Sequence, residues 1–175
     1  MISYNVFLDR ERLPGVADWA RVLEEGSFGT KLNIEFDPRT HSGYVPCPDD
    51  RTGFEYYLEA FERPTYEIGE EGAKVIGKRN AVVSLRLSGR PSDREAAIGA
   101  AATLAAMTDG VLFDSESGHF ISSADALAWA RNEKYQPIAT ARRRAARRKA
   151  RLTPPIILRL LMILFLVAAI YWLRR

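Results

Sequence analysis

Cys47 and the two histidines, His41 and His119, are the residues that could supply a thiolate nucleophile and its general base. Cys47 and His41 lie six residues apart in THSGYVPCPDD, a stretch broken by Pro and Gly that could bring them together. The surrounding sequence lacks the Gly-rich turn and helix start of a nucleophile site. A small buried thiol is therefore the stronger interpretation, and a lone cysteine is typical of a reducing compartment.

Two groups of side chains could hold a metal ion: His41, Cys47, Asp49 and Asp50, and the turn residues Asp114, Glu116 and His119. Neither completes a recognised ligand spacing, and the second group is too short for a calcium loop. The glycines of GEEGAKVIG, residues 69–77, lack the strand–GxxxxGK[ST]–helix order of a phosphate loop. The sequence therefore predicts no catalytic residue, no metal site and no cofactor, and favours a non-enzymatic protein.

A stripe of acidic and aromatic residues is the strongest indication of a binding surface. In residues 54–59, Phe54, Tyr56 and Leu58 alternate with the residues on the opposite side of a strand. If the first set faces the core, the other side points outward and suits a cationic protein surface. If helices cover both faces of the sheet, these aromatic residues are buried instead. The predicted partner-binding residues are Glu55, Tyr57, Glu59 and Phe61.

These residues need a sheet to position them, and period-two alternation predicts its strands. Strands are expected at residues 2–9, 32–37, 54–59, 65–68, 81–87, 110–113 and 119–121. Apolar residues at helical spacing predict a helix from Val16 that ends near Gly26. A second helix should run to Thr108 from a capping box formed by Ser92 and Glu95, and a third should begin after Ser122 or Ser123.

Sequential strands without crossover helices favour an α+β domain, with a mostly antiparallel sheet and helices on one side of it. We expect this acidic domain to cover residues 1–138, followed by a basic linker over 139–155 and a transmembrane helix over 156–173.

The segment IILRLLMILFLVAAIYWL, residues 156–173, predicts a single membrane span. As a helix it would be about 27 Å long, close to the ~30 Å hydrocarbon core of a bilayer. Its one charged residue, Arg159, lies in the first turn, where its side chain could reach the headgroups. Tyr171 and Trp172 lie at the other end, where amphipathic rings are favoured.

A basic stretch precedes this span and predicts its orientation. Basic residues near a span favour the cytoplasmic side, and the first residues of the chain do not resemble a secretory signal. We expect the domain in the cytoplasm at a bacterial inner membrane, with a short C-terminus outside. The residues expected to meet lipid headgroups, together with Arg159, are Arg142, Arg143, Arg144, Arg147, Arg148, Lys149 and Arg151.

The whole-chain net charge of +3 averages two unlike parts. All 22 acidic residues lie in residues 1–140 with 15 of the 25 basic ones, so this part has a net charge of −7. An acidic domain disfavours nucleic acid and favours cationic partners, although the same charge also keeps a cytosolic domain soluble.

Residues 92–131 combine an Ala-rich helix, the strand TDGVLFD and a last helix with ALAWA. In these features they resemble small α+β proteins of bacterial toxin–immunity systems. It implies stoichiometric binding and occlusion of a toxin, and it transfers no catalytic residue.

The sequence as a whole predicts a membrane-tethered protein-binding domain, an immunity protein that neutralises a cognate toxin. The alternatives are a membrane-bound regulator or scaffold in envelope assembly or secretion, and a hydrolase that uses Cys47 and His41.

Overall fold

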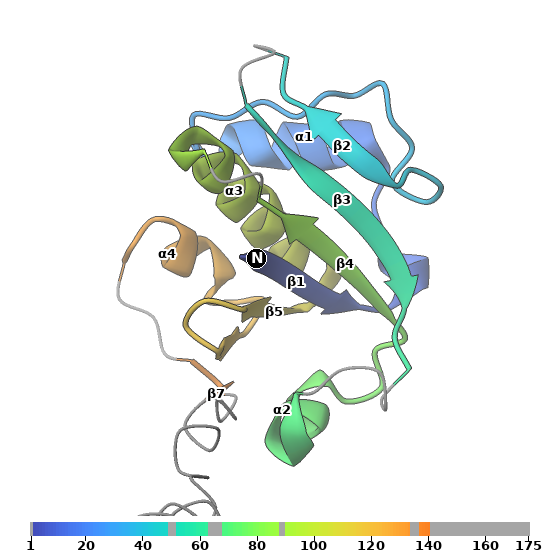
Figure 1. Cartoon of the computed structure of the whole chain (residues 1–175), viewed down its shortest axis with the longest axis vertical. Helices are drawn as coiled ribbons and strands as arrows, with labels where there is room; N and C mark the ends of the chain where they lie inside the picture. The colour runs from blue at the N-terminus through green and yellow to red at the C-terminus, as the bar shows by residue number, and fades with distance from the viewer. Residues whose placement is uncertain (1, 49–51, 63–67, 88–89, 134–136, 141–175) are drawn as a thin grey trace, which may run out of the picture. The chain divides into compact units, whose positions relative to one another are not determined.

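The structure, a computed structural model, describes residues 2–48, 52–62, 68–87, 90–133 and 137–140. These residues form an α+β domain around one seven-stranded sheet, in the order β2-β3-β4-β1-β5-β6-β7 (Figure 1). Every neighbouring pair of strands is antiparallel. The predicted fold class of the domain is therefore confirmed.

The sheet brings together strands that are far apart in the sequence. The N-terminal strand β1 lies near its middle, between β4 and β5. The strand bounds are β1 Ser3–Leu8, β2 Gly43–Pro46, β3 Gly53–Ala60, β4 Ala81–Arg86, β5 Val111–Asp114, β6 His119–Ile121 and β7 Ala139–Thr140. Strand β7 extends the sheet two residues beyond the expected domain boundary at residue 138.

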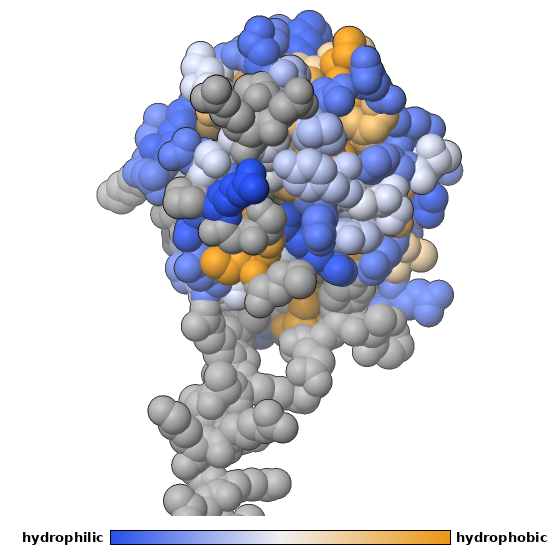
Figure 2. Space-filling model, turned by 45° about the horizontal axis from the view of Figure 1, so that its top comes forward, coloured by the Kyte–Doolittle hydropathy of each residue, from blue (hydrophilic) through white to orange (hydrophobic). Residues whose placement is uncertain are grey.

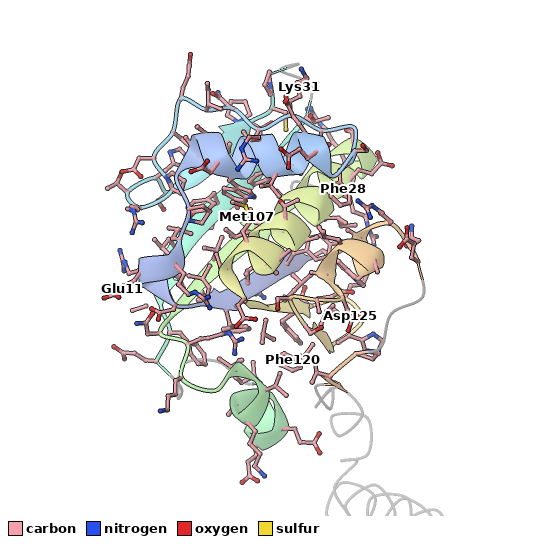
Figure 3. The ribbon with its side chains drawn as sticks, turned by 180° about the vertical axis from the view of Figure 1, so that it is seen from behind. Glu11, Phe28, Lys31, Met107, Phe120 and Asp125 are labelled. Atoms are coloured by element: carbon pink, nitrogen blue, oxygen red, sulfur yellow. The ribbon has the colours of Figure 1, made fainter. Side chains whose placement is uncertain are left out.

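Three helices cover one face of this sheet: α1 (Val16–Glu25), α3 (Pro91–Thr108) and α4 (Ala126–Ala130). Figure 3 shows them in front of the strands. Alanine dominates the buried positions of α3, which allows close approach to α1 and the sheet. The fully buried Trp19 of α1 links the helices, because its Nε1 donates to Ala100 O and Thr103 Oγ1, both at 3.1 Å.

The fourth helix, α2 (Gly69–Ile76), packs against the opposite face. Its Ile76 belongs to a second apolar cluster with Phe7, Val82 and Phe120. Gly72 permits this contact, because a Cβ there would lie 2.7 Å from Phe120 Cζ. The prediction that the helices lie on one side was therefore wrong. The sequence patterns predict no helix at α2.

The strand predicted at residues 32–37 was also wrong. Burial does not follow the alternation in the sequence, since Leu32 is buried whereas Ile34, two residues later, is 61% exposed, and the segment is a loop. Side chains supply its local bonds: Asn33 Oδ1 accepts from Glu35 N at 2.8 Å, and Asp37 Oδ1 accepts from Arg39 N at 2.9 Å. Such turns compete with strand pairing. The edge strand β2 follows this loop, in a stretch where no strand was predicted.

Helix starts also differ from the prediction. Helix α3 begins at Pro91, which suits the first helical position, so Ser92 lies inside the first turn. The N-cap residue is Arg90, without a side-chain cap bond, and the expected capping box is absent. Ser122 does make a hydrogen bond just before α4: its Oγ accepts from the backbone N of Asp125, the N-cap residue, at 3.1 Å. The strand expected at residues 65–68 lies outside the described residues except for Ile68, which directly precedes α2.

Candidate functional site

One part of the sheet has no described helix over it. Helix α2 covers the end near β5 and β6, whereas the outward sides of β2, β3, β4 and β1 face the viewer in Figure 1. Pairing between neighbouring strands fixes which side chains share this surface. One row across the strands consists of Tyr57, Ser84 and Asn5, and the next row consists of Tyr44, Glu55, Arg86 and Ser3. We call this surface the open face; its residues are Ser3, Asn5, Tyr44, Glu55, Tyr57, Glu59, Ser84 and Arg86.

Three of the four predicted partner-binding residues lie on the open face. Glu55 and Tyr57 are half-buried and Glu59 is exposed. Phe61 does not contribute, because it is only 8% exposed and its ring centroid lies 5.0 Å from that of Phe7. The prediction of an exposed Phe61 fails because the strand ends at Ala60 and α2 covers the apolar cluster beside it.

Arg86 changes the charge of the predicted acidic stripe. Its guanidinium lies 4.4 Å from the centroid of the Tyr57 ring, and Arg86 is the direct cross-strand neighbour of Glu55. The Tyr57 hydroxyl donates to Glu55 Oε2 at 3.3 Å. The cation, the ring and the carboxylate thus form one connected group, which we call the Tyr57–Arg86 stack. The alternation of Arg86 with Leu85 and Leu87 places Arg86 on the outward side of β4, but it does not identify the cross-strand neighbour.

Small polar residues form the middle of the open face. Ser84 is 4% exposed, and Asn5 Nδ2 donates to Ser3 Oγ at 3.3 Å. Figure 2, tilted from the view of Figure 1, shows weakly polar side chains in pale blue gathered beside charged ones in deeper blue. Small polar side chains therefore lie next to the larger side chains of Tyr57 and Arg86.

The edge strand β2 is poorly suited to pair with a strand of another protein. Cys47 N donates to Thr52 O at 2.8 Å, so Cys47, Val45 and Gly43 turn their backbone groups toward β3. Tyr44 and Pro46 then turn theirs outward. Because Pro46 has no N–H, the outer edge of this short strand lacks a donor there. A partner would contact side chains rather than extend the sheet.

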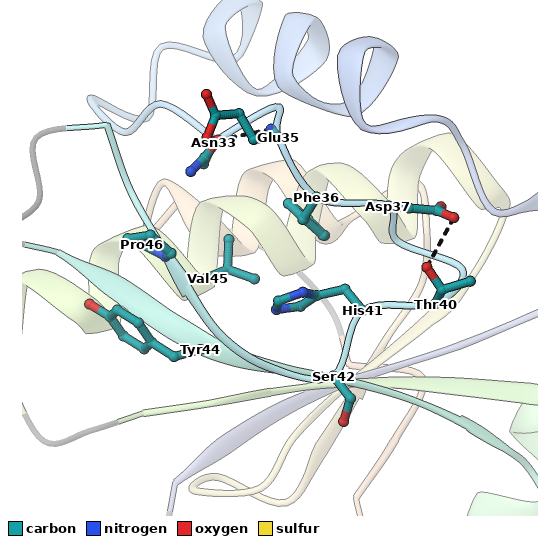
Figure 4. Close-up of a pocket in the computed structure, with 10 residues that line it drawn as sticks. All are labelled: Asn33, Glu35, Phe36, Asp37, Thr40, His41, Ser42, Tyr44, Val45 and Pro46. Carbon is teal, nitrogen blue, oxygen red and sulfur yellow. Dashed lines mark hydrogen bonds between the residues drawn. The ribbon is translucent and has the colours of Figure 1, made fainter.

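A cavity of about 500 Å³ lies between the loop before β2 and β2 itself (Figure 4). The His41 ring packs against Phe36, with centroids 5.2 Å apart, and its Nε2 is buried without a hydrogen-bond partner among the described residues. The residues that line the cavity are Asn33, Glu35, Phe36, Asp37, Thr40, His41, Ser42, Tyr44, Val45 and Pro46.

Buried hydrogen bonding holds this loop in place. The Tyr56 hydroxyl, from the helix-covered side of β3, donates to Pro38 O at 2.6 Å. Burial, with a smaller contribution from the Asp37 carboxylate, raises the pKa of Tyr56 far above its usual value. Tyr56 therefore stays neutral and serves as a fixed donor below the loop.

His41 and Cys47 do not form a catalytic pair in this structure. They flank β2, whose four extended residues separate them by about 13 Å at ~3.3 Å per residue, far beyond hydrogen-bond reach. Cys47 lines a different cavity, of about 290 Å³, together with Lys31 and Ser92.

The candidate metal ligands are likewise dispersed or otherwise engaged. Asp49 and Asp50 lie outside the described residues. Asp114 accepts from Glu116 N at 2.8 Å and from Ser117 Oγ at 2.6 Å, and Glu116 pairs with Arg94. Among the residues that the structure describes, no group of three or more potential ligands gathers around a common point.

The predicted headgroup residues Arg142 to Arg159 and the predicted span lie outside the described residues. Within the described part of the chain, no helix combines the length and the apolar character needed to cross a bilayer.

Comparisons of the chain with protein-family models, characterised proteins and solved structures found no match.

Proposed function

We propose that this chain is a membrane-tethered, non-enzymatic protein-binding domain, and that the open face contacts its partner. The observation that carries this proposal is the Tyr57–Arg86 stack, which lies on a sheet surface without a described helix over it. A tyrosine and an arginine are among the residues that contribute most to protein interfaces. Stacking restrains the Arg86 side chain before binding, which lowers the entropy lost when a partner immobilises it.

The open face combines charges of both signs. Glu55 and Glu59 carry negative charge, Arg86 carries positive charge, and the small polar centre adds hydrogen-bonding groups. This pattern favours a partner with a complementary mixed surface, and the net charge of −7 over residues 1–140 favours one that is basic overall.

We further propose that the domain is cytoplasmic and anchored at a bacterial inner membrane by residues 156–173. Arg142 to Arg151 and Arg159 would meet the lipid headgroups. Tethering would raise the effective concentration of the domain where an incoming protein first appears. This arrangement suits an immunity protein that occludes a cognate toxin, the role implied by the resemblance of residues 92–131.

The proposal is tested by affinity capture from detergent-solubilised membranes, with bound proteins identified and quantified by mass spectrometry. Full-length protein is compared with a form that ends at Ala141 and so retains β7. A double variant, Tyr57→Ala with Arg86→Ala, removes the stack, and Arg21→Ala on the exposed side of α1 is the matched control.

We expect one stoichiometric partner with the full-length protein, the Ala141 form and the Arg21 control, and its loss with the double variant. A toxin as the partner would support the immunity role. A partner that is lost with the anchor but bound by the double variant would contradict the proposal, because the anchor would then be the binding element.

A further inference from the structure

The open face is too small to be the whole contact surface of a stable complex. Four strands spaced ~4.8 Å apart and about six residues long span roughly 19 Å by 20 Å, or about 400 Å². A stable complex covers about 800 Å² on each partner. A partner bound there would therefore also contact the surface next to the open face.

The cavity beside β2 adjoins this surface directly. Tyr44 belongs both to the open face, opposite Glu55, and to the cavity lining, and it is 50% exposed. A protein that lies across β3 and reaches around the edge strand β2 would thus meet the cavity, which lies on the Val45 side of that strand (Figure 4).

The cavity lining is apolar below and negatively charged at its rim. The buried Val45 and the half-buried Phe36 supply apolar surface, and the His41 ring packs against Phe36 beside them (Figure 4). Glu35 and Asp37 supply two carboxylates, and none of the ten lining residues is Lys or Arg.

The two carboxylates differ in availability. Asp37 already accepts from Arg39 N and, at 3.1 Å, from Thr40 Oγ1. The exposed Glu35 carboxylate makes no hydrogen bond or ion pair with the described residues. Glu35 is therefore the group that an incoming cation would meet.

This combination selects one kind of occupant. An arginine or lysine side chain has an apolar stem that packs on aromatic and aliphatic surface, and a cationic head that bonds carboxylates. An apolar side chain would leave Glu35 desolvated without compensation, and an acidic one would be repelled. The volume of about 500 Å³ falls within the usual range of ligand pockets.

We propose that the cavity between the 33–42 loop and β2 receives an arginine or lysine side chain of the protein partner. This contact presupposes the partner-binding function proposed above. It adds to that function the chemistry of one recognised group and a second contact site next to the Tyr57–Arg86 stack.

The test uses a probe in place of the partner. The full-length protein in detergent micelles, labelled with ¹⁵N in its histidines, is titrated with N-acetyl-arginine amide and separately with the uncharged N-acetyl-citrulline amide. The chain has two histidines, so His41 reports on the cavity and His119, on β6, is an internal control. Glu35→Gln removes the available carboxylate, and Glu11→Gln, on the exposed turn Arg10–Arg12 outside the cavity lining, is the matched control.

We expect the arginine probe to shift the His41 imidazole resonances saturably, with a dissociation constant of about 1 mM, the range for a ligand of this size. The His119 resonances should not move. Glu35→Gln should weaken binding about threefold, the scale of an exposed ion pair, and Glu11→Gln should not.

Equal shifts with both probes, unchanged His41 resonances, or unaltered binding by Glu35→Gln would each overturn the proposal. Because no partner is present in this titration, its failure is distinct from failure of the capture experiment. A negative probe titration would leave the proposed function intact if the captured partner depends on Tyr57 and Arg86.

Discussion

Replacement of Tyr56 by phenylalanine tests how the wall of the cavity is held. Tyr56 is fully buried, and its hydroxyl is the donor for the carbonyl of the buried Pro38 at 2.6 Å. Phenylalanine keeps the ring, which packs with Phe36 and Trp19 at centroid distances of 5.6 and 6.2 Å, and removes only the donor. The variant therefore isolates one hydrogen bond between the sheet and the loop.

The expected cost follows from the burial of both groups. Loss of the hydrogen bond leaves the Pro38 carbonyl without its donor, at a cost of about 1–2 kcal/mol in the free energy of unfolding. For a domain of about 140 residues this corresponds to a fall in Tm of roughly 3–8 °C. Trp19 lies against Tyr56, so tryptophan fluorescence during denaturant or thermal unfolding of the full-length protein would report the change.

The neighbouring tyrosine provides the control. The Tyr57 hydroxyl lies on the open face and donates to Glu55 Oε2 at 3.3 Å, where both groups are half-buried. Tyr57→Phe should change the free energy of unfolding by less than about 0.5 kcal/mol. Equal losses for the two variants, or no loss for Tyr56→Phe, would refute the assignment of Tyr56 as the anchor of the loop.

Three further predictions concern packing and pH. Gly72→Val should destabilise the domain by about 1–3 kcal/mol in denaturant unfolding, because a Cβ there would meet Phe120 at 2.7 Å; unchanged stability would show that α2 does not pack closely on the sheet. Thr103→Val should lower the free energy of unfolding by about 1 kcal/mol, since Trp19 Nε1 loses one of its two acceptors. If Thr103→Val lowered it by more in a protein that already carries Trp19→Phe, the hydrogen bond between Trp19 and Thr103 would be contradicted. Because burial raises the pKa of Tyr56, its contribution to stability is complete below about pH 10 and is lost as the pH rises further. Tyr56→Phe should therefore lessen the fall in Tm above that pH, and an identical alkaline profile would count against it.

The strands in the middle of the sheet were predictable because one side of each faces the helix-covered core. In residues 3–8 and 81–86, every second residue faces this core, and the two segments form β1 and β4 as predicted. Local alternation did not suffice at Leu32 and Ile34. There the side chains of Asn33 and Asp37 bond nearby backbone N–H groups, and the segment does not join the sheet.

Part of the candidate site was predictable and part was not. Alternation within one strand placed Glu55, Tyr57 and Glu59 on the same side. The position of Arg86 beside Tyr57 depends on the register between β3 and β4, which no pattern within either strand specifies. Burial of Phe61 depends on α2, whose eight residues were too glycine-rich for its short apolar pattern to stand out. The cavity depends on how the loop folds back over β2.

Contact between the open face and a partner is tested most directly by site-specific photo-cross-linking in native membranes. A photoreactive phenylalanine analogue replaces Tyr57 on the open face, or Ala17 on the exposed side of α1 as the control. We predict one discrete adduct from position 57 that contains a single partner protein, and no adduct from position 17. An adduct from position 17 without one from position 57 would contradict the account, because the partner would then bind the helical layer.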